Sequence, residues 1–481
     1  MVRVPWNQSE CGTHVIILIM ENKRIQFQQE RQAMMLEKPI PKLVFQMAIP
    51  TIISMLVMSL YNMADTYFVS SLGTAATGAV GVNLSLMSFI QMAGTALAMG
   101  ANSYIARLLG EKRNDEASAV LSIAFFTSLG IGILMLMGGI IFIKPLVVFM
   151  GAKGDVIPYA MDYAIYILLA APFMMGVFVL NQCLRAEGSA TLSMFGVLFG
   201  TILNLVLDPL LISVAGMGVA GAAIATAISK FSSFVILVTP YLRSKTMIPL
   251  SLRNFRPNMT IVSELTKMGF PTLARTALTT IASIATNNIA SLFSVSALAA
   301  ISVVNKIMVF VSSAVLGFAQ GYQPVAGFNW GAKRYDRVRK SFWFSSVVSV
   351  ICVTVVAVGV AIAAPWLMQV FTKYDAEMID IGVVAIRTQC LAMPSVAWVI
   401  VVNMTYAGLG KAMGAAVLSV LRQGIFFIPM TVLLPHLYGV YGLASVQGVA
   451  DMLTLLVSLP LSIMILREIS RKEKEQCDCA C

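Results

Sequence analysis

The chain carries the stretch GEKRND at residues 110–115, and the related stretch GAKRYD follows 221 residues later at residues 331–336. A Pro-Thr pair that begins at Pro50 and a GVxGxA motif that begins at Gly218 return with the same spacing. Three separated windows share one register without a net insertion between them, which indicates an internal duplication. In an apolar chain, parallel repeats of this kind are typical of transporters built from two membrane bundles.

The composition places the chain in the membrane. Of its 481 residues, 58% are hydrophobic and 11% are charged, whereas soluble domains carry about 25% charged residues. Twelve apolar stretches reach the roughly 20 residues that cross the hydrocarbon core of a bilayer. We therefore expect an all-α integral membrane protein with twelve transmembrane helices in two pseudo-symmetric six-helix bundles.

The predicted spans define the domain organisation. They are residues 43–69, 77–98, 117–143, 159–183, 191–214, 220–241, 269–293, 297–319, 341–363, 379–402, 412–434 and 443–465. Residues 39–241 then form an N-terminal lobe, 242–268 a cytoplasmic linker and 269–466 a C-terminal lobe. We expect residues 1–38 to be a flexible extension and 467–481 an unstructured cytoplasmic tail. Within the linker, we expect a short helix lying on the membrane surface just before the seventh span.

The net charge of +11 reflects membrane orientation rather than nucleic-acid binding. With the N-terminus inside, 25 Lys and Arg residues lie on the cytoplasmic side, and only Lys144, Lys153 and Lys373 lie outside. Basic residues concentrate on the cytoplasmic side of membrane proteins. The sequence therefore predicts a multi-pass protein of the cell membrane with both termini in the cytoplasm.

Several polar side chains fall at one depth within the predicted N-terminal lobe. A carboxylate near the bilayer centre costs about 2.5–3.5 kcal/mol on insertion scales, so an acid there usually faces a cavity and has a function. Asp65 and Asp208 lie late in the outward-running first and fifth spans. Asn204 lies one helical turn before Asp208, on the same face. Tyr163 and Thr226 lie early in the inward-running fourth and sixth spans, at the same level.

This group of oxygen-bearing side chains suits a hard monovalent cation or a proton. We expect cation or proton coupling at Asp65, Asn204, Asp208, Thr226 and Tyr163, with Na⁺ possible at the first four. Burial and the like-charged neighbour are expected to raise the apparent pKa of the acid pair. The alternative is a structural polar network that only links helices.

The motifs around these acids resemble those of one transporter family. Residues 61–66 read YNMADT and are followed by Gly73, and residues 204–209 read NLVLDP. The loop residues 321–333 contain GYQP and NWGAK. Together these motifs resemble multidrug and toxic compound extrusion (MATE) transporters, and the DinF-like branch is the most similar. The resemblance covers about residues 40–468.

The resemblance implies a secondary active antiporter with a central cleft between two lobes. Such a protein exports organic cations or amphipathic drugs in exchange for Na⁺ or H⁺ by alternating access. In the DinF-like branch the coupling site comprises a first-helix acid, an Asn/Asp pair of the fifth helix, and a nearby tyrosine and threonine. These map onto Asp65, Asn204, Asp208, Tyr163 and Thr226.

The second lobe lacks the corresponding acids. In the 221-residue register, Asp65 aligns with Thr286 and Thr226 aligns with Gln447. The NorM-like branch places acids in the seventh and tenth helices, but Thr286 and its neighbours are neutral here, and Asp380 lies at the outer edge of the tenth span. The resemblance therefore implies coupling in the N-terminal lobe alone.

Other residues are candidates for the cleft and for its movement. Pro50 removes a backbone hydrogen bond within the first span and is the expected helix bend. Tyr61, Lys306 and Arg422 are candidates for lining the cleft. For Lys306 and Arg422 the alternative is pairing with backbone carbonyls or with Asp451.

Other functional classes fit the sequence less well. An ATP-driven pump needs a phosphate-binding Gly-x₄-Gly-Lys-Ser/Thr loop, which does not occur in the sequence. A polytopic membrane enzyme would need a nucleophile with its base or a metal cluster, yet the two histidines, His14 and His436, lie in the extension and an external loop. A lipid-linked precursor flippase of a related superfamily is the remaining alternative. We expect no cofactor beyond the coupling ion, small-molecule substrates, the lipid bilayer as surroundings, no nucleic-acid partner and a monomer.

Overall fold

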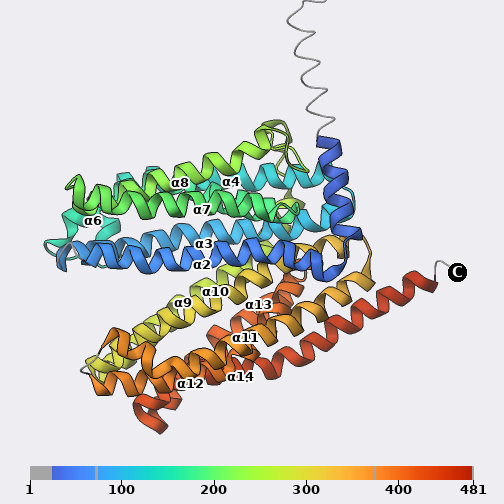
Figure 1. Cartoon of the computed structure of the whole chain (residues 1–481). Coiled ribbons are helices and arrows are strands. Elements are labelled where there is room, and N and C mark those ends of the chain that lie inside the picture. The colour runs from blue at the N-terminus through green and yellow to red at the C-terminus, as the bar shows by residue number, and fades with distance from the viewer. Residues whose placement is uncertain (1–23, 71–73, 373–374, 479–481) are drawn as a thin grey trace, which may run out of the picture.

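The computed structural model describes residues 24–70, 74–372 and 375–478, with side chains throughout except at 63–70 and 74–77. The described elements are helices, arranged in two bundles that lie side by side (Figure 1). The predicted all-α membrane fold is confirmed.

The N-terminal bundle contains six long helices that match the predicted spans. They are α2 (Ile40–Ser70), α3 (Thr74–Gly110), α4 (Asn114–Ile141), α6 (Val156–Ala186), α7 (Ala190–Pro209) and α8 (Gly218–Leu242). The short α5 (Ile143–Phe149) follows α4, and a π-helical turn, Leu210–Val214, extends α7.

The C-terminal bundle repeats this arrangement. Its helices are α9 (Met259–Phe293), α10 (Val295–Gly331), α11 (Tyr335–Phe371), α12 (Ala376–Gly408), α13 (Ala412–Val420) and α14 (Phe427–Asp478), with the π-helical segment η3 (Leu421–Phe426) between the last two. Gly439 has non-helical backbone angles inside α14 and divides it into two parts. The six crossings of this bundle are therefore α9 to α12, α13 with the first part of α14, and the remainder of α14.

Hydropathy alone finds fewer spans than the fold contains. Within the described residues, ten helical segments are long and apolar enough to cross a membrane. One of them, 412–478, includes both arms of the chain around Gly439. The helix α9 is not among the ten, because it carries several polar side chains along its length. Counting the segment 412–478 as two crossings and adding α9 gives twelve crossings, six in each bundle.

The repeated stretch that begins at Gly110 forms a tight turn between two helices. Lys112 has φ 62° and Lys333 has φ 58°, so both lysines occupy the left-handed region at equivalent positions of the two lobes. The Arg113 backbone N–H donates to the Leu108 carbonyl at 2.9 Å, and the second turn contains the equivalent bond. The duplicated motif is therefore a device that ends one long helix and starts the next.

The glycines of the same motif bring the two lobes into contact. A Cβ atom on Gly110 would clash with the carbonyl oxygen of Phe328 in α10, and one on Gly331 would clash with the carbonyl oxygen of Arg107 in α3. The glycines permit a close backbone approach that no other residue allows. Each lobe therefore uses the same turn to contact the other.

The lobes touch near one end and spread apart toward the other (Figure 1). Near the end that carries both described termini, Gly317 of α10 packs against the backbone of Ile52 in α2, and Gly269 of α9 packs against Ala96 of α3. Lys306 lies three turns before Gly317 on the same face of α10 and is exposed. The same face of α10 is thus covered by the N-terminal lobe at Gly317 and exposed at Lys306. The helix therefore moves away from the N-terminal lobe toward its own N-terminal end.

The described residues near both ends of the chain are helical, which the sequence did not predict. Residues 24–37 form a helix, so the prediction of a flexible extension is wrong there, and residues 1–23 lie outside the described part. Arg31 donates from Nη1 to the Gly188 carbonyl at 3.0 Å, and Met35 is fully buried. The hydrogen bond of Arg31 and the burial of Met35 hold this helix against the rest of the protein.

The C-terminal tail also continues as a helix, because α14 extends to Asp478. Glu473 of this extension forms an ion pair with Arg339 at 3.1 Å, and Lys472 lies 4.7 Å from the ring centre of Trp330. The prediction of an unstructured tail is therefore wrong for residues 467–478. The linker was expected to contain a separate short helix after residue 258. In the structure these residues are the first part of α9.

Candidate functional site

Asn204 and Asp208 form a buried polar pair on α7. Asn204 donates from Nδ2 to Oδ1 of Asp208 at 3.1 Å. Their spacing of four residues places the two side chains on the same face of the helix. Both side chains are buried. That face packs toward α2 and α8, whereas the other side of α7 exposes large apolar residues such as Phe195 and Phe199.

The neighbouring helices bury two more of the predicted site residues. Tyr163 of α6 and Thr226 of α8 are each 1% exposed, and α8 packs against both α6 and α7. Asp65 belongs to α2, which packs against α7, but its side chain lies outside the described residues. The structure joins Asn204 to Asp208 and buries Tyr163 and Thr226 in adjacent helices. Ion or proton coupling at this group stays a prediction.

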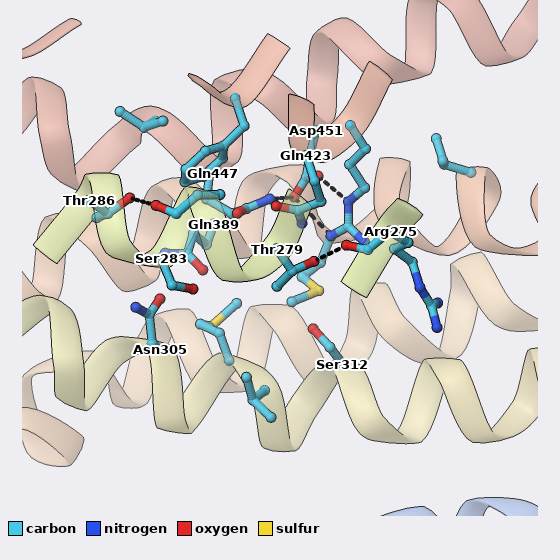
Figure 2. A pocket seen from close by; sticks show the side chains of 18 of the residues that line it. Arg275, Thr279, Ser283, Thr286, Asn305, Ser312, Gln389, Gln423, Gln447 and Asp451 are labelled. Atoms are coloured by element: carbon cyan, nitrogen blue, oxygen red, sulfur yellow. Dashed lines mark hydrogen bonds and ion pairs between the residues drawn. The ribbon is translucent and has the colours of Figure 1, made fainter. Parts of the chain in front are cut away.

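The C-terminal lobe contains a cavity of about 380 Å³ that the sequence did not reveal. Side chains from α9, α10, α12, α13, η3 and α14 line it. Figure 2 shows Thr279 and Thr286 on the α9 side, Asn305 and Ser312 on the α10 side, and Gln447 on the α14 side. Amide and hydroxyl groups thus share the cavity wall with apolar side chains.

An ion pair fixes one wall of this cavity. Arg422 donates from Nε to Oδ1 of Asp451 at 2.6 Å and from Nη2 to Oδ2 at 3.4 Å. Gln447, one turn before Asp451 on α14, donates to the same Oδ2 at 3.1 Å (Figure 2). Arg422 reaches Asp451 from the π-helical segment η3, and such segments often occur at functional positions.

The remaining predicted residues have distinct surroundings. Arg422 lines the cavity inside the C-terminal lobe and pairs with Asp451, so the alternative of an ion pair is confirmed for this residue. Its place in the cleft between the lobes stays a prediction. Lys306 is exposed, Tyr61 is partly buried on α2, and Pro50 is buried inside α2 without ending it.

The duplication offered the signal that sequence reasoning missed. Thr286 and Gln447, which align with Asp65 and Thr226 in the 221-residue register, both line the C-terminal cavity. The cavity therefore corresponds by pseudo-symmetry to the predicted coupling site of the first lobe. The sequence alignment of the two halves already paired these residues, but it was used only to compare the acids and not to locate a cavity.

Comparison with known proteins confirms the family. The MatE family model matches residues 50–210 and 271–433, two segments whose starts are 221 residues apart. The multidrug export protein MepA of Staphylococcus aureus strain MSSA476 is 24% identical over 438 residues, covering 90% of this chain and 95% of that protein. MepA of Staphylococcus saprophyticus is 25% identical and covers 88% of this chain and 93% of that protein.

The fold is also similar to solved structures. One, described as the outward-facing conformation of a multidrug resistance MATE family transporter of the MOP superfamily, superposes with a TM-score of 0.86 at 24% identity, covering 91% of this chain and 98% of the other. The two segments that match the family model together span most of the chain. The solved transporter structure shares its overall fold. The chain belongs to the MatE family, the multidrug and toxic compound extrusion transporters.

Proposed function

We propose that this protein is a secondary active antiporter of the cell membrane. It exports organic cations or amphipathic drugs in exchange for Na⁺ or H⁺, with both termini in the cytoplasm. The names of the MepA relatives support multidrug export. The distribution of basic residues supports the orientation.

The observation that carries this proposal is the buried pair of Asn204 and Asp208. A carboxylate inside a membrane bundle is costly and tends to bind or relay an ion. The amide of Asn204 orients one oxygen of Asp208, and the hydroxyl groups of Tyr163 and Thr226 are buried in the helices next to it. These oxygens suit Na⁺ or a proton.

The arrangement of the lobes supports alternating access. Contacts between the lobes concentrate near the termini, and the helices diverge toward the other end (Figure 1). With the termini in the cytoplasm, this conformation faces outward. Ion binding in the N-terminal lobe would then bend α2 near Pro50 and expel the substrate outward.

Transport in proteoliposomes tests the proposal. Ethidium uptake is measured under an imposed Na⁺ gradient and, separately, an imposed pH gradient. Asp208→Asn is expected to reduce gradient-driven uptake at least tenfold, in line with the loss of an essential ionisable group. Asp162→Asn is the matched control, because Asp162 lies on α6 beside Tyr163 but is exposed. Uptake by Asp208→Asn at the rate of the control would refute the coupling assignment.

A further inference from the structure

We propose that the cavity of the C-terminal lobe is a binding site for the negatively charged group of an amphipathic organic molecule, and that Arg275 receives this charge. The inference concerns binding inside one lobe. It does not depend on which ion drives transport or on the coupling site of the other lobe.

Arg275 provides a positive charge that the protein itself does not neutralise. It lines the cavity from α9 and is partly exposed there. Within the described part of the chain, its guanidinium has neither a hydrogen-bond acceptor nor an acidic partner. Charged residues inside membrane bundles normally pair with one another or face a water-filled space. Arg275 is therefore available to an anion that enters the cavity.

The other two charges of the cavity largely satisfy each other. Asp451 accepts hydrogen bonds from both Arg422 and Gln447, so its negative charge is already compensated. Arg275, Arg422 and Asp451 are the charged residues among the lining side chains, and their formal sum is +1. A single carboxylate or comparable anion would neutralise the site.

The remaining wall suits an amphipathic ligand of drug size. Gln389, Gln423 and Asn305 present amide groups, while Ile301, Met308 and Phe427 present apolar surface. The volume of about 380 Å³ falls within the range of small-molecule sites, roughly 300–1,000 Å³. Flexible methionine also suits ligands of varied shape.

The duplication shows that the two lobes have diverged in charge at this place. Arg275 aligns with Ser54 in the 221-residue register, and Thr286 aligns with Asp65. The first lobe thus has an acid where the second is neutral, and the second has a base where the first has a hydroxyl. The C-terminal cavity therefore differs in charge from the predicted coupling site of the first lobe, and a molecule with an anionic group fits the cavity.

A pair of dyes that differ in one charge tests the site. Rhodamine B carries a free carboxylate, and its ethyl ester has the same ring system without that negative charge. Dissociation constants of both dyes are measured by fluorescence anisotropy with the purified full-length protein in neutral detergent, without any ion gradient. We expect the wild type to bind rhodamine B about tenfold more tightly than the ester, as one charge-assisted hydrogen bond allows.

The ratio of the two constants is the decisive quantity. Arg275→Gln is expected to bring the ratio close to one, and Arg275→Lys to keep most of the preference because it retains the charge. Arg387→Gln is the matched control, since Arg387 belongs to α12 of the same lobe and is exposed but does not line the cavity. Equal binding of the two dyes by the wild type, binding of neither dye, or an equal loss in Arg387→Gln overturns the proposal.

A lipid headgroup presents the same chemistry as a drug carboxylate. The measurement is therefore repeated with phosphatidylglycerol and with phosphatidylcholine in the micelles. Competition by phosphatidylglycerol that disappears in Arg275→Gln assigns the site to an anionic lipid, whereas an unchanged dye ratio assigns it to the soluble ligand. Because Asp208→Asn is expected to keep the dye ratio, a failure of ion-coupled transport is distinguishable from a failure of this site.

Discussion

Arg185 of α6 donates a 2.6 Å hydrogen bond from Nη1 to Oε1 of Gln320 on α10, and this bond joins the two lobes inside a buried interface. The same guanidinium donates to Oγ of Ser193 at 3.1 Å. Gln182, one helical turn before Arg185, donates to Gln320 at 3.5 Å and accepts from Asn102 at 3.0 Å. A polar network thus holds the lobes together at the end where they touch.

Removal of the Gln320 side chain is expected to weaken this closed end. In Gln320→Ala the buried Arg185 keeps only Ser193 among the acceptors that the structure shows, and an unsatisfied charged donor costs about 1.5–3 kcal/mol. Separation of the lobes would let water reach the guanidinium. The population should therefore shift toward conformations that are open at this end.

Electron-electron distance measurements between spin labels check this shift. Labels at the exposed positions Arg253 of the linker and Lys474 of α14 report the separation of the lobes. Gln320→Ala should populate longer distances than the wild type. Ser313→Ala is the control, because Ser313 lies on the same helix and its hydroxyl bonds only within α10. An identical distance distribution in Gln320→Ala and wild type would contradict the role of this network.

Glu187 is expected to make the stability of the protein depend on pH. It lies in the loop after α6, is fully buried, and accepts hydrogen bonds from Tyr241 at 2.9 Å and from the Met247 backbone N–H at 2.6 Å. Burial raises the pKa of Glu187 to about 8, against its usual 4.5. The native state therefore holds a proton that the unfolded state releases between these two values.

Stability is expected to fall as pH rises through that window. With more protons bound in the native state, the free energy of unfolding decreases by about 1.4 kcal/mol per pH unit, or about 3 kcal/mol between pH 6 and pH 9. The melting temperature in detergent should drop over this range in the wild type. Glu187→Gln, which cannot ionise, should show a flatter profile. Parallel profiles for the two proteins would argue against a raised pKa.

Apolar runs and the internal repeat predicted the fold because both can be read directly from the sequence. The spans follow from the length of apolar runs, and the two lobes follow from the 221-residue register. The family and its nature as a transporter rather than an enzyme are confirmed by the match to the MatE model. The DinF-like branch stays a prediction, as does export in exchange for Na⁺ or H⁺.

The ends of the chain were mispredicted because their order comes from partners distant in sequence. Met35 is fully buried, and its backbone carbonyl accepts a hydrogen bond from Arg337. Glu473 forms an ion pair with Arg339. Neither pairing has a local signal in an otherwise polar segment. Composition alone then indicates flexibility, whereas tertiary contacts decide the structure.

One candidate site could be predicted from local sequence, and the other depends on tertiary packing. The contact of Asn204 with Asp208 follows from their spacing on one helix, so the sequence was sufficient. The C-terminal cavity depends on how six elements pack, and the ion pair that fixes its wall joins Arg422 to a residue 29 positions later. Sequence reasoning left that pairing as one alternative, because distance along the chain does not reveal which basic residue Asp451 contacts.

The interlobe glycines should resist even the smallest substitution. A methyl group at Gly331 would clash with the backbone of Arg107, and rigid backbone cannot yield as a flexible side chain can. Gly331→Ala is expected to cost about 1–3 kcal/mol of stability, as overpacking does, and to lower the melting temperature in detergent. Gly359→Ala is the control, because a Cβ on Gly359 in α11 meets open space and alanine favours helix by up to about 1 kcal/mol. Equal melting temperatures for the two variants would refute the close approach.

The ion pair of Arg422 and Asp451 should be strongly coupled in stability. Asp451 is 5% exposed and Arg422 is 22% exposed, so loss of either partner leaves a largely buried charge. Arg422→Met or Asp451→Leu alone is expected to cost about 3–5 kcal/mol, whereas the double variant should recover much of that loss, because no charge then remains unpaired. Urea unfolding in detergent gives the coupling energy from the four proteins of this double-mutant cycle. Additive losses, with no recovery in the double variant, would mean that the two residues act separately and that Gln447 alone satisfies Asp451.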